Sequence, residues 1–397
     1  MKKTQYLIIG AGIIGLSIAR ALKKRDASGK ILIIEKEQDT AQHASGRNSG
    51  VLHAGFYYTA NSLKARFTVD GNRLLKEYCR EKGLPLNECG KLVVAMDETE
   101  LQTLYELEKR GVRNGVKVEL IDVAAAKEIE PNIKTHQKAL YSPTTASVDP
   151  IKVCQSLKED LKQQGVEFQW QVSYVRCEKG TVETNQGEIE AKQVINCAGL
   201  YADKIAQDFD FGHDYTIMPF KGLYLKYKTN KTAIKTNIYP VPNLRNPFLG
   251  VHFTKTVYGD IKIGPTAIPA FWRENYQGFT NFQSKEFLQI MGYQSQLLLK
   301  NRFHFRNLAV EEMKKYQKSY FVGLAAKLVQ QIDAEGFSEY TKPGIRAQLL
   351  DRNTLELVQD FVVEGDARSV HVLNAVSPAF TCAFPFAEHI VSQYCPA

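Results

Sequence analysis

The chain has 397 residues, of which 44% are hydrophobic and 24% charged, so it suits two globular domains better than one core. Its net charge of +8 is not gathered into a run of Lys or Arg, and we therefore expect no nucleic-acid partner. The seven cysteines form no C-x-x-C pair, which argues against a disulfide framework and a zinc site. We expect no bound metal and a reducing compartment.

The apolar stretches of the chain are too short to cross a membrane, since none reaches the roughly 18 residues that a spanning helix needs. A first strand is expected about five residues into the sequence, which leaves no room for a signal peptide. A basic surface could still attract anionic lipid headgroups. The expected location is therefore cytoplasmic, with peripheral contact to the inner membrane left open.

The N-terminal part predicts a strand, a helix and a second strand, followed by a long loop. Residues 6–10 and 30–35 are apolar runs typical of buried strands, and apolar residues recur at helical spacing over 13–22. Two strands joined by a helix within about 30 residues form a parallel βαβ unit. Residues 40–60 are polar and glycine-rich, and so long a loop in a compact fold is usually functional.

Further along, hydrophobic periodicity and turn residues predict both helices and strands. Asp149 and Pro150 open a helix as N-cap and first helical residue, and it extends to about residue 164. Residues 219–257 are rich in aromatic and β-branched side chains, which indicates antiparallel sheet. The other expected helices cover residues 62–82, 98–115, 284–300, 307–317, 321–331 and 383–394. The other expected strands cover residues 167–174, 180–184, 188–190, 193–196 and 369–373.

A glycine-rich turn joins the first strand to the first helix. Gly10, Gly12 and Gly15 form the pattern G-x-G-x-x-G, and Glu35 ends the next strand. In this context the pattern predicts a dinucleotide site, with the pyrophosphate beside Gly12 at the positive end of the helix. Glu35 would accept hydrogen bonds from the ribose hydroxyls, which disfavours NADP. The alternative is a glycine turn without a ligand.

The glycine motif alone does not distinguish FAD from NAD. Its position close to the N-terminus and the Ser/Gly/Asn-rich loop after the second strand favour FAD. So does Asn196-Cys197-Ala198-Gly199, where small residues after a late strand let the chain pass close to a cofactor. The further residues expected to contact FAD are Ile14, Lys36, Ser45, Asn48, Ser49, Gly50, Ala198, Gly199, Ser377 and Pro378.

The expected fold class is α/β, α+β overall, with a discontinuous Rossmann-like FAD-binding domain. We assign residues 1–90, 145–215 and 340–397 to this domain. Residues 91–144 and 216–339 are assigned to a substrate domain built on a mixed or antiparallel sheet with helices.

Five motifs spread along the chain carry a resemblance to a known family. They are H-A-G-F-Y-Y at 53–58, N-P-F-L-G-V-H-F-T at 246–254, I-G-P-T-A at 263–267, P-G-I-R-A-Q at 343–348 and N-A-V-S-P-A at 374–379. With the N-terminal fingerprint, the chain resembles the FAD-dependent oxidoreductases of the D-amino-acid-oxidase-like superfamily. Within that superfamily it is most similar to the L-2-hydroxyglutarate dehydrogenase/oxidase family. One departure is Lys221 in P-F-K-G, where the family's pattern has Arg.

The resemblance implies oxidation of L-2-hydroxyglutarate, a small dicarboxylate, to 2-oxoglutarate. A hydride would pass from the α-carbon to flavin N5, and the electrons would go on to quinone or dioxygen. Two rivals remain. One is an FAD-dependent amino-acid or glycine oxidase of the same fold, and the other is a flavoprotein redox subunit without turnover.

The reaction needs a base for the hydroxyl proton, and two histidines are candidates. His53 lies in the long polar loop beside Gly50 and Gly55, where it could act as the base, contact the flavin or only order the loop. His252 is the rival base on an expected strand, where it could equally be a hydrogen-bonded sheet residue.

The reaction also needs groups that hold two carboxylates. Arg346 is the first candidate because a guanidinium pairs with a carboxylate through two hydrogen bonds, although a surface salt bridge is the alternative. Candidates for the second carboxylate are Lys221, Tyr57 and Tyr58, each of which could instead pack inside the protein. Thr381, like Ser377 and Pro378, belongs to the start of the last expected helix. That helix end could face the flavin N1–C2=O edge or be an ordinary cap.

Overall fold

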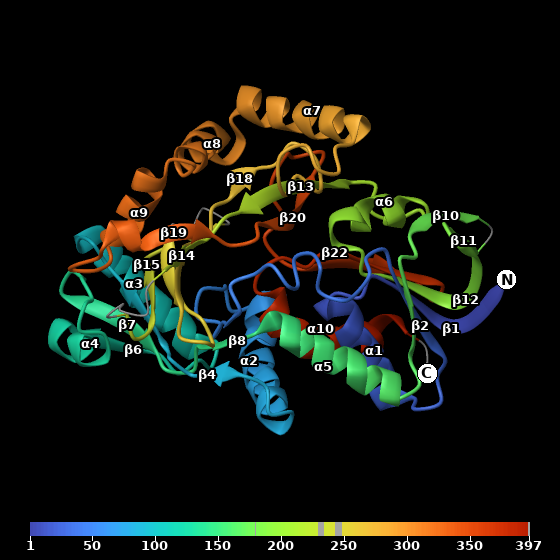
Figure 1. Ribbon diagram of the computed structural model, residues 1–397, viewed down its shortest axis with the longest axis horizontal. Helices are drawn as coiled ribbons and strands as arrows, with labels where there is room; N and C mark the ends of the chain where they lie inside the picture. Colours follow the sequence, from blue (N-terminus) through green and yellow to red (C-terminus); the bar gives the residue numbers. More distant parts are fainter. Residues whose placement is uncertain (179, 229–233, 243–247, 396–397) are drawn as a thin grey trace. The chain divides into compact units, whose positions relative to one another are not determined.

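The computed structural model describes residues 1–397 apart from 179, 229–233, 243–247 and 396–397. The chain forms two compact units, each made of separated segments (Figure 1). Unit 1 comprises Met1–Asn48, Pro150–Pro219 and Arg346–Ala397. Unit 2 comprises Ser49–Asp149 and Phe220–Ile345.

Unit 1 is built on an eight-stranded sheet with a parallel centre in the order β9-β2-β1-β12-β22. Three further strands, β10, β11 and β21, join it in antiparallel fashion. The strands are β1 (Lys2–Ile9), β2 (Ile31–Glu35), β9 (Glu167–Trp170), β10 (Tyr174–Glu178), β11 (Thr181–Thr184), β12 (Gly187–Asn196), β21 (Val362–Gly365) and β22 (Ser369–Asn374).

The central strands of unit 1 are apolar on both faces, as parallel strands covered on both sides must be. Leu7, Ile8 and Ile9 of β1 are all buried, although successive side chains point to opposite faces. On one side, helix α1 packs against α5 and α10 (Figure 1). The helices of this unit are α1 (Ile13–Arg25), α5 (Pro150–Gln163), α6 (Ala202–Gln207) and α10 (Ala379–Tyr394), with the 3₁₀ turn η1 (Gly199–Tyr201).

Unit 2 is built on a mixed eight-stranded sheet in the order β19-β14-β17-β16-β15-β5-β7-β6. Only the pair β15–β5 is parallel. The strands are β5 (Lys91–Val94), β6 (Glu119–Asp122), β7 (Lys138–Ser142), β14 (Leu225–Tyr227), β15 (Asn237–Pro240), β16 (His252–Lys255), β17 (Ile261–Gly264) and β19 (Phe337–Tyr340).

Shorter strands and helices complete unit 2. A small sheet contains β3 (Val51–Leu52), β8 (Ala146–Val148) and β4 (Leu86–Asn87). Another contains β18 (Ile268–Pro269), β13 (Tyr215–Gly222) and β20 (Gly344–Asp351), of which β13 and β20 carry the chain from one unit to the other. The helices are α2 (Leu63–Glu81), α3 (Glu98–Arg113), α4 (Val123–Ile129), α7 (Ser284–Lys300), α8 (Phe305–Lys314) and α9 (Lys318–Ala326), with 3₁₀ turns η2 (Arg302–His304) and η3 (Ala334–Gly336).

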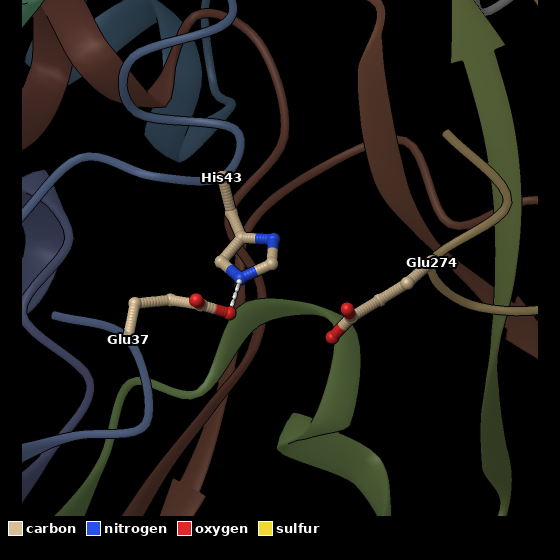
Figure 2. Close-up of side chains that lie close together, drawn as sticks. All are labelled: Glu37, His43 and Glu274. Atoms are coloured by element: carbon tan, nitrogen blue, oxygen red, sulfur yellow. Dashed lines mark hydrogen bonds and ion pairs between the residues drawn. The ribbon is translucent and has the colours of Figure 1, made fainter. Parts of the chain in front are cut away.

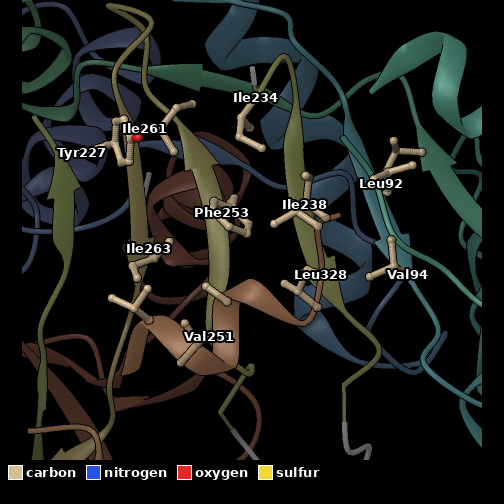
Figure 3. Close-up of a cluster of buried hydrophobic side chains, with 14 of the residues drawn as sticks. Leu92, Val94, Tyr227, Ile234, Ile238, Val251, Phe253, Ile261, Ile263 and Leu328 are labelled. Atoms are coloured by element: carbon tan, nitrogen blue, oxygen red, sulfur yellow. The ribbon is translucent and has the colours of Figure 1, made fainter. Parts of the chain in front are cut away.

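The large sheet of unit 2 has two different faces. Figure 3 shows the apolar one, where Leu92, Ile238 and Phe253 project from neighbouring strands toward the segment that contains Leu328. Helices α4 and α9 contribute to this cluster. The other face is covered by α3 through Leu101, Leu104 and Leu107. This second face also carries polar and charged side chains, among them Lys91, His252 and Lys262.

The expected long helices are confirmed, with α2, α3, α5, α7 and α10 close to the predicted bounds. The last helix starts at Ala379, a few residues before the expected start at 383. The expected strands 188–190 and 193–196 are one strand, β12, because the whole segment pairs with β1. Part of the expected antiparallel segment 219–257 lies outside the described residues, including Asn246 and Pro247 of the motif at 246–254.

Four stretches lie in a different unit from the one we expected: residues 49–90, 145–149 and 340–345 belong to unit 2, and residues 216–219 belong to unit 1. We assigned residues 49–90 to the cofactor domain, but they belong to unit 2. The reason is local pairing: β3 and β4 both pair with β8, and the side chain of Asn72 on α2 donates to the carbonyls of Leu52 and Thr144. The assignment of FAD to unit 1 and of substrate to unit 2 stays a prediction.

Candidate active site

The glycine motif of unit 1 forms a turn in which side chains have no room. Gly10 follows β1 with a φ of 105°, and a Cβ on it would lie 2.6 Å from the carbonyl oxygen of Cys197. A Cβ on Gly12 would lie 2.9 Å from Ser45 Oγ, and one on Gly15 would collide with the carbonyl oxygen of Gly10. The turn therefore needs glycine for close backbone approach, as a dinucleotide cradle does.

The loop after β2 folds back over this turn. The Glu35 carboxylate accepts hydrogen bonds from the N–H groups of Ala11 (2.8 Å) and Glu37 (3.1 Å). Ser45 Oγ accepts the N–H of Ile13 at 2.9 Å, and the Thr40 hydroxyl donates to the carbonyl of Ala11. Glu35 keeps acceptor capacity for ribose hydroxyls, because a carboxylate offers about four lone-pair positions.

The same loop contains a pair that the sequence analysis did not single out. His43 Nε2 lies 2.8 Å from Glu37 Oε1 (Figure 2). This hydrogen bond and the charge of Lys36 lower the pKa of Glu37 to about 2, against the effect of burial. Lys36 also lies 5.3 Å from the ring centroid of Tyr201. A histidine six residues from a glutamate has no recognisable spacing, so only the folded loop reveals the pair.

The segment after β12 lies beside the glycine turn. Asn196 is buried, and its side chain accepts from Ala198 N (3.1 Å) and donates to the carbonyl of Ala202 (2.8 Å). The Cα of Ala198 would be 3.5 Å from a Cβ on Gly10. Gly199 has a φ of 55°, with open space where its Cβ would be. Unit 1 thus brings Ala198 next to the motif, and its residues fit a dinucleotide such as FAD.

The remaining residues expected near FAD are divided between the units. Ile14 lies in the buried first turn of α1, and Asn48 ends the first segment of unit 1. Ser49 and Gly50 begin unit 2. Two more, Ser377 and Pro378, precede α10 in unit 1, where the N-cap residue Pro378 makes no side-chain cap. Their contacts with FAD stay predictions.

Unit 2 gathers polar side chains on the α3 face of its large sheet. The pairings Val93–Tyr239, Ile238–Phe253 and Thr254–Lys262, combined with strand alternation, place one set of side chains on the same side. All members of this set are buried or lie on buried strands. They are Lys91, Tyr239, His252, Thr254 and Lys262. We call this set the polar face.

His252 is held firmly on the polar face. Its Nδ1 lies 2.8 Å from the carbonyl oxygen of Gly250, so Nδ1 carries the hydrogen and Nε2 keeps the lone pair. Its ring stacks on Tyr239 with 3.6 Å between centroids. Burial lowers the pKa of His252 to about 3, opposed by the Gly250 carbonyl and reinforced by the charges of Lys91 and Lys262. His252 is therefore a neutral imidazole at physiological pH.

His53 is also buried in unit 2, 7% exposed, in the segment between β3 and α2. Its carbonyl accepts from Asn72 Nδ2 at 3.2 Å, and its Nδ1 lies 3.5 Å from Lys91 Nζ. Nearby, Tyr57 is buried and its hydroxyl has no hydrogen-bond partner in the described part of the chain. Burial raises the pKa of Tyr57 well above 10, which keeps it a neutral donor. Tyr58 is half-buried.

Lys221, a predicted substrate-binding residue, is one of several buried lysines in unit 2. Lys221 on β13 is buried, and its Nζ lies 3.4 Å from Asn275 Oδ1. Burial lowers the pKa of Lys221. Burial also lowers the pKa of Lys262 to about 8, although Asp260 opposes this. Lys91 and Lys262 were not among the predicted site residues, because a single lysine in a short apolar strand looks like a surface residue.

The other two candidate substrate residues belong to unit 1. Arg346 is half-buried on β20, and Thr381 is buried in the first turn of α10. Their roles toward substrate stay predictions.

Comparison with known proteins identifies the family. The chain matches the family of FAD dependent oxidoreductases over residues 5–393. It belongs to that family. Human mitochondrial L-2-hydroxyglutarate dehydrogenase is 38% identical, with 98% of this chain and 88% of the human protein covered. L-2-hydroxyglutarate dehydrogenase of Escherichia coli K12 is 34% identical, with coverage of 98% and 92%.

Solved structures of other proteins support the fold. FAD-bound L-alpha-glycerophosphate oxidase from Mycoplasma pneumoniae aligns with a TM-score of 0.78 at 21% identity, covering 98% of this chain and 94% of that one. Glycine oxidase from Geobacillus kaustophilus aligns with a TM-score of 0.71 at 18% identity, covering 99% and 94%. At such identities the likeness concerns the fold alone, so it does not favour the amine-oxidase rival.

Proposed function

We propose that this FAD-dependent oxidoreductase converts L-2-hydroxyglutarate to 2-oxoglutarate. The observation that carries the proposal is similarity over nearly the whole chain, at 34–38% identity, to relatives named for that activity. The chemistry of unit 2 agrees with an acid substrate, because this unit buries Lys221 together with the hydrogen-bonding side chains of His53 and Tyr57. A buried cation is costly, and binding an anion offsets that cost.

In the proposed reaction FAD supplies the hydride acceptor, and the protein must manage a proton and two carboxylates. His53 is the proposed base that takes the hydroxyl proton. His252 is a weaker candidate, because its low pKa makes it a poor proton acceptor at neutral pH. We assign it instead the role of a neutral hydrogen-bond partner through Nε2.

The carboxylates are assigned to separate residues. We propose Arg346 for one of them, since a guanidinium forms paired hydrogen bonds with a carboxylate. The other is proposed to contact Lys221 and the hydroxyls of Tyr57 and Tyr58. Thr381 of unit 1 is proposed separately as a donor to the substrate. Support comes from the burial of Lys221 beside Asn275 and from the unpartnered Tyr57 hydroxyl.

The cofactor role is proposed for the glycine motif of unit 1 and its surrounding loop. The pyrophosphate would lie at the N-terminus of α1 and the ribose at Glu35. The start of α10, after Ser377 and Pro378, is proposed to stabilise negative charge on the reduced flavin. Its support is that the N-cap residue, Pro378, makes no side-chain hydrogen bond to this helix end.

The electrons are proposed to leave to quinone or, as the alternative, to dioxygen. A quinone dissolves in the membrane, and unit 2 has a surface suited to a peripheral contact. Around α7 and α8, exposed apolar side chains stand among exposed cations. The apolar ones are Phe279, Leu288, Leu298, Leu299, Val310 and Met313, and the cations are Lys285, Lys300, Arg302, Arg306 and Lys314. We call this the α7–α8 surface and propose that it contacts anionic lipid.

A spanning segment is a separate question. In the described part of the chain, no helix is both long enough and apolar enough to cross a bilayer.

The substrate assignment is tested by mixing the FAD-loaded protein anaerobically with L-2-hydroxyglutarate and following the flavin absorbance near about 450 nm. Bleaching by this compound, and not by D-2-hydroxyglutarate, L-lactate, glycine or D-alanine, is the expected result. Bleaching by an amino acid would favour the amine-oxidase rival. A flavin that none of the acids reduces would favour a redox subunit without turnover.

A further inference from the structure

Lys91 is a buried lysine that the proposed reaction does not yet use. It is the first residue of β5, points to the polar face and is fully buried at 0% exposure. Its Nζ lies 3.5 Å from His53 Nδ1. Among the described residues no carboxylate forms an ion pair with it. The only polar side chain that the structure shows at hydrogen-bond distance is therefore the candidate base.

Aromatic rings enclose the same ammonium group. Lys91 Nζ lies 4.0 Å from the ring centroid of Tyr239, 5.2 Å from that of Tyr57 and 5.6 Å from that of Phe56. His252 stacks on Tyr239 at 3.6 Å, so Lys91 and His252 occupy opposite faces of that ring. The cage excludes water from Lys91 and orients Nζ toward His53.

The titratable groups near Lys91 are few. Besides His53, they are the phenols of Tyr57 and Tyr239, the imidazole of His252 and the thiol of Cys89. None is an anion at neutral pH, because burial raises the pKa values of the phenols and the thiol. Burial lowers the pKa of Lys91 to about 7, with a small opposing effect from Cys89. Both forms of Lys91 are thus accessible near neutral pH, unlike those of an exposed lysine.

We propose that Lys91 is the proton acceptor behind His53, so that the two side chains form a buried relay. In the neutral form, Lys91 Nζ offers a lone pair to Nδ1–H of His53, which leaves Nε2 as the base. When the substrate is oxidised, its O–H bond breaks and an Nε2–H bond forms. The Nδ1–H bond then breaks, and its proton moves to Nζ to give the ammonium. The two electrons of the α C–H bond leave as hydride to FAD, and those of the O–H bond form the carbonyl.

The relay rests on the proposed oxidation of a 2-hydroxy acid and gives Lys91 a role through His53. A different role for Lys91 would be a permanent cation that holds a substrate carboxylate. The two roles predict opposite behaviour for arginine. A guanidinium would preserve a carboxylate clamp, but it cannot accept a proton. As a permanent donor to Nδ1, it would also keep the hydrogen of His53 on Nε2 and block the base.

The test compares anaerobic flavin reduction by L-2-hydroxyglutarate in wild type, Lys91→Met and Lys91→Arg, in rapid mixing from about pH 5 to about pH 10. The wild-type limiting rate constant should rise with pH through an apparent pKa near 7. Lys91→Met should lower the limiting rate constant about 10- to 100-fold. It should also move the rise of this rate constant with pH to lower pH. Lys91→Arg should be as slow as Lys91→Met or slower.

The matched control is Lys314→Met, a lysine on α8 of the same unit that pairs with Glu311 and is 49% exposed. It should stay within about twofold of wild type, as expected of a surface ion pair. FAD content per chain is measured for each variant. If Lys91→Arg does not bind FAD, the relay is judged from the pH dependence of the limiting rate constant in wild type and in Lys91→Met.

Three results would overturn the relay. The first is flavin reduction by Lys91→Arg at a near-wild-type rate. The second is a Lys91→Met variant whose limiting rate constant is unchanged and which only needs more substrate to reach it. The third is a wild-type limiting rate constant that does not change with pH. Failure of the substrate assignment is distinguishable, because the wild-type flavin would then not bleach with L-2-hydroxyglutarate. In that case the same comparison is made with whichever acid bleaches it.

Discussion

His53 and His252 are both buried in unit 2, but their neighbours give them different abilities to accept a proton. His252 has its Nδ1 tied to a carbonyl and its ring pressed on Tyr239, so it cannot readily become charged. His53 has its Nδ1 next to Lys91, a group that can give or take a proton near neutral pH. Residue identity alone makes the two equal candidates for the base, and hydrogen-bond partners separate them.

Replacing each histidine tests that separation. We expect His53→Asn to lower the limiting rate constant of flavin reduction by about 10²- to 10⁴-fold, which is what a general base contributes. We expect His252→Asn to have an effect at least about tenfold smaller, because it removes only a neutral partner. Anaerobic rapid mixing with L-2-hydroxyglutarate measures both. The reverse order of the two defects would make His252 the base.

The low pKa of His252 also predicts how stability depends on pH. The folded protein keeps His252 neutral down to about pH 3, whereas the unfolded chain protonates it below about pH 6.5. The contribution of this group to stability should therefore be complete above pH 6.5 and decline as pH falls toward 3, with a loss of about 3 kcal/mol at pH 4. In His252→Asn, the urea-unfolding midpoint should therefore fall less steeply as the pH is lowered. The exposed His304→Asn should follow wild type, and an unchanged slope in His252→Asn would contradict the linkage.

At the scale of elements, the turn between β1 and α1 shows why helix propensity is secondary to packing. Gly15 lies inside a helix, where alanine would ordinarily be preferred by about 1 kcal/mol. Here the added Cβ would collide with the Gly10 carbonyl and lie 3.3 Å from Ile8 Cγ2. The glycine therefore sets the closeness of α1 to β1, on which the expected cofactor cradle depends.

Gly15→Ala should consequently lower both FAD content and the thermal midpoint of unfolding, with a cost of about 1–3 kcal/mol from overpacking. The matched control is Gly323→Ala, inside α9, where an added Cβ meets nothing within 4 Å. That substitution should leave FAD content unchanged and raise stability by up to about 1 kcal/mol. Equal losses in both variants would mean that close packing at Gly15 is not the cause.

The large sheet of unit 2 shows a second effect at this scale. Short strands such as β5 and β16 carry apolar side chains toward α9 and polar side chains toward α3. Strands of three to five residues are too short for their alternation to be recognised reliably in sequence. This is why β5, β6, β7 and β8 were not among the expected strands.

At the scale of the whole molecule, the net charge of +8 is modest, but exposed cations and exposed apolar side chains both occur along α7 and α8. Such a combination favours contact with anionic lipid, since apolar insertion and charge attraction act together. The surface lies in unit 2 and includes none of the residues proposed for catalysis. Membrane contact and chemistry should therefore be separable by mutation.

The separation is tested with sedimented vesicles. Wild type should bind vesicles that contain phosphatidylserine more than vesicles of phosphatidylcholine alone, and less as salt is raised. Leu298→Gln with Leu299→Gln should reduce binding about tenfold or more without changing flavin reduction. The control is Val112→Gln on α3, another exposed apolar residue. Equal binding by wild type and the Leu298/Leu299 variant would reject the surface as a lipid contact.

The sequence by itself determined the glycine turn, the long amphipathic helices, the parallel centre of unit 1 and the family. Each of these depends on local spacing or on motifs that survive without knowledge of contacts, such as the 3.6-residue period of a helix. Only the tertiary structure decided that residues 49–90 belong to unit 2, that Glu37 pairs with His43, and that Lys91 is buried beside His53. These features depend on strand pairing and on burial away from solvent. The free energy of a charged side chain changes with its surroundings, and the residue type alone does not reveal those surroundings.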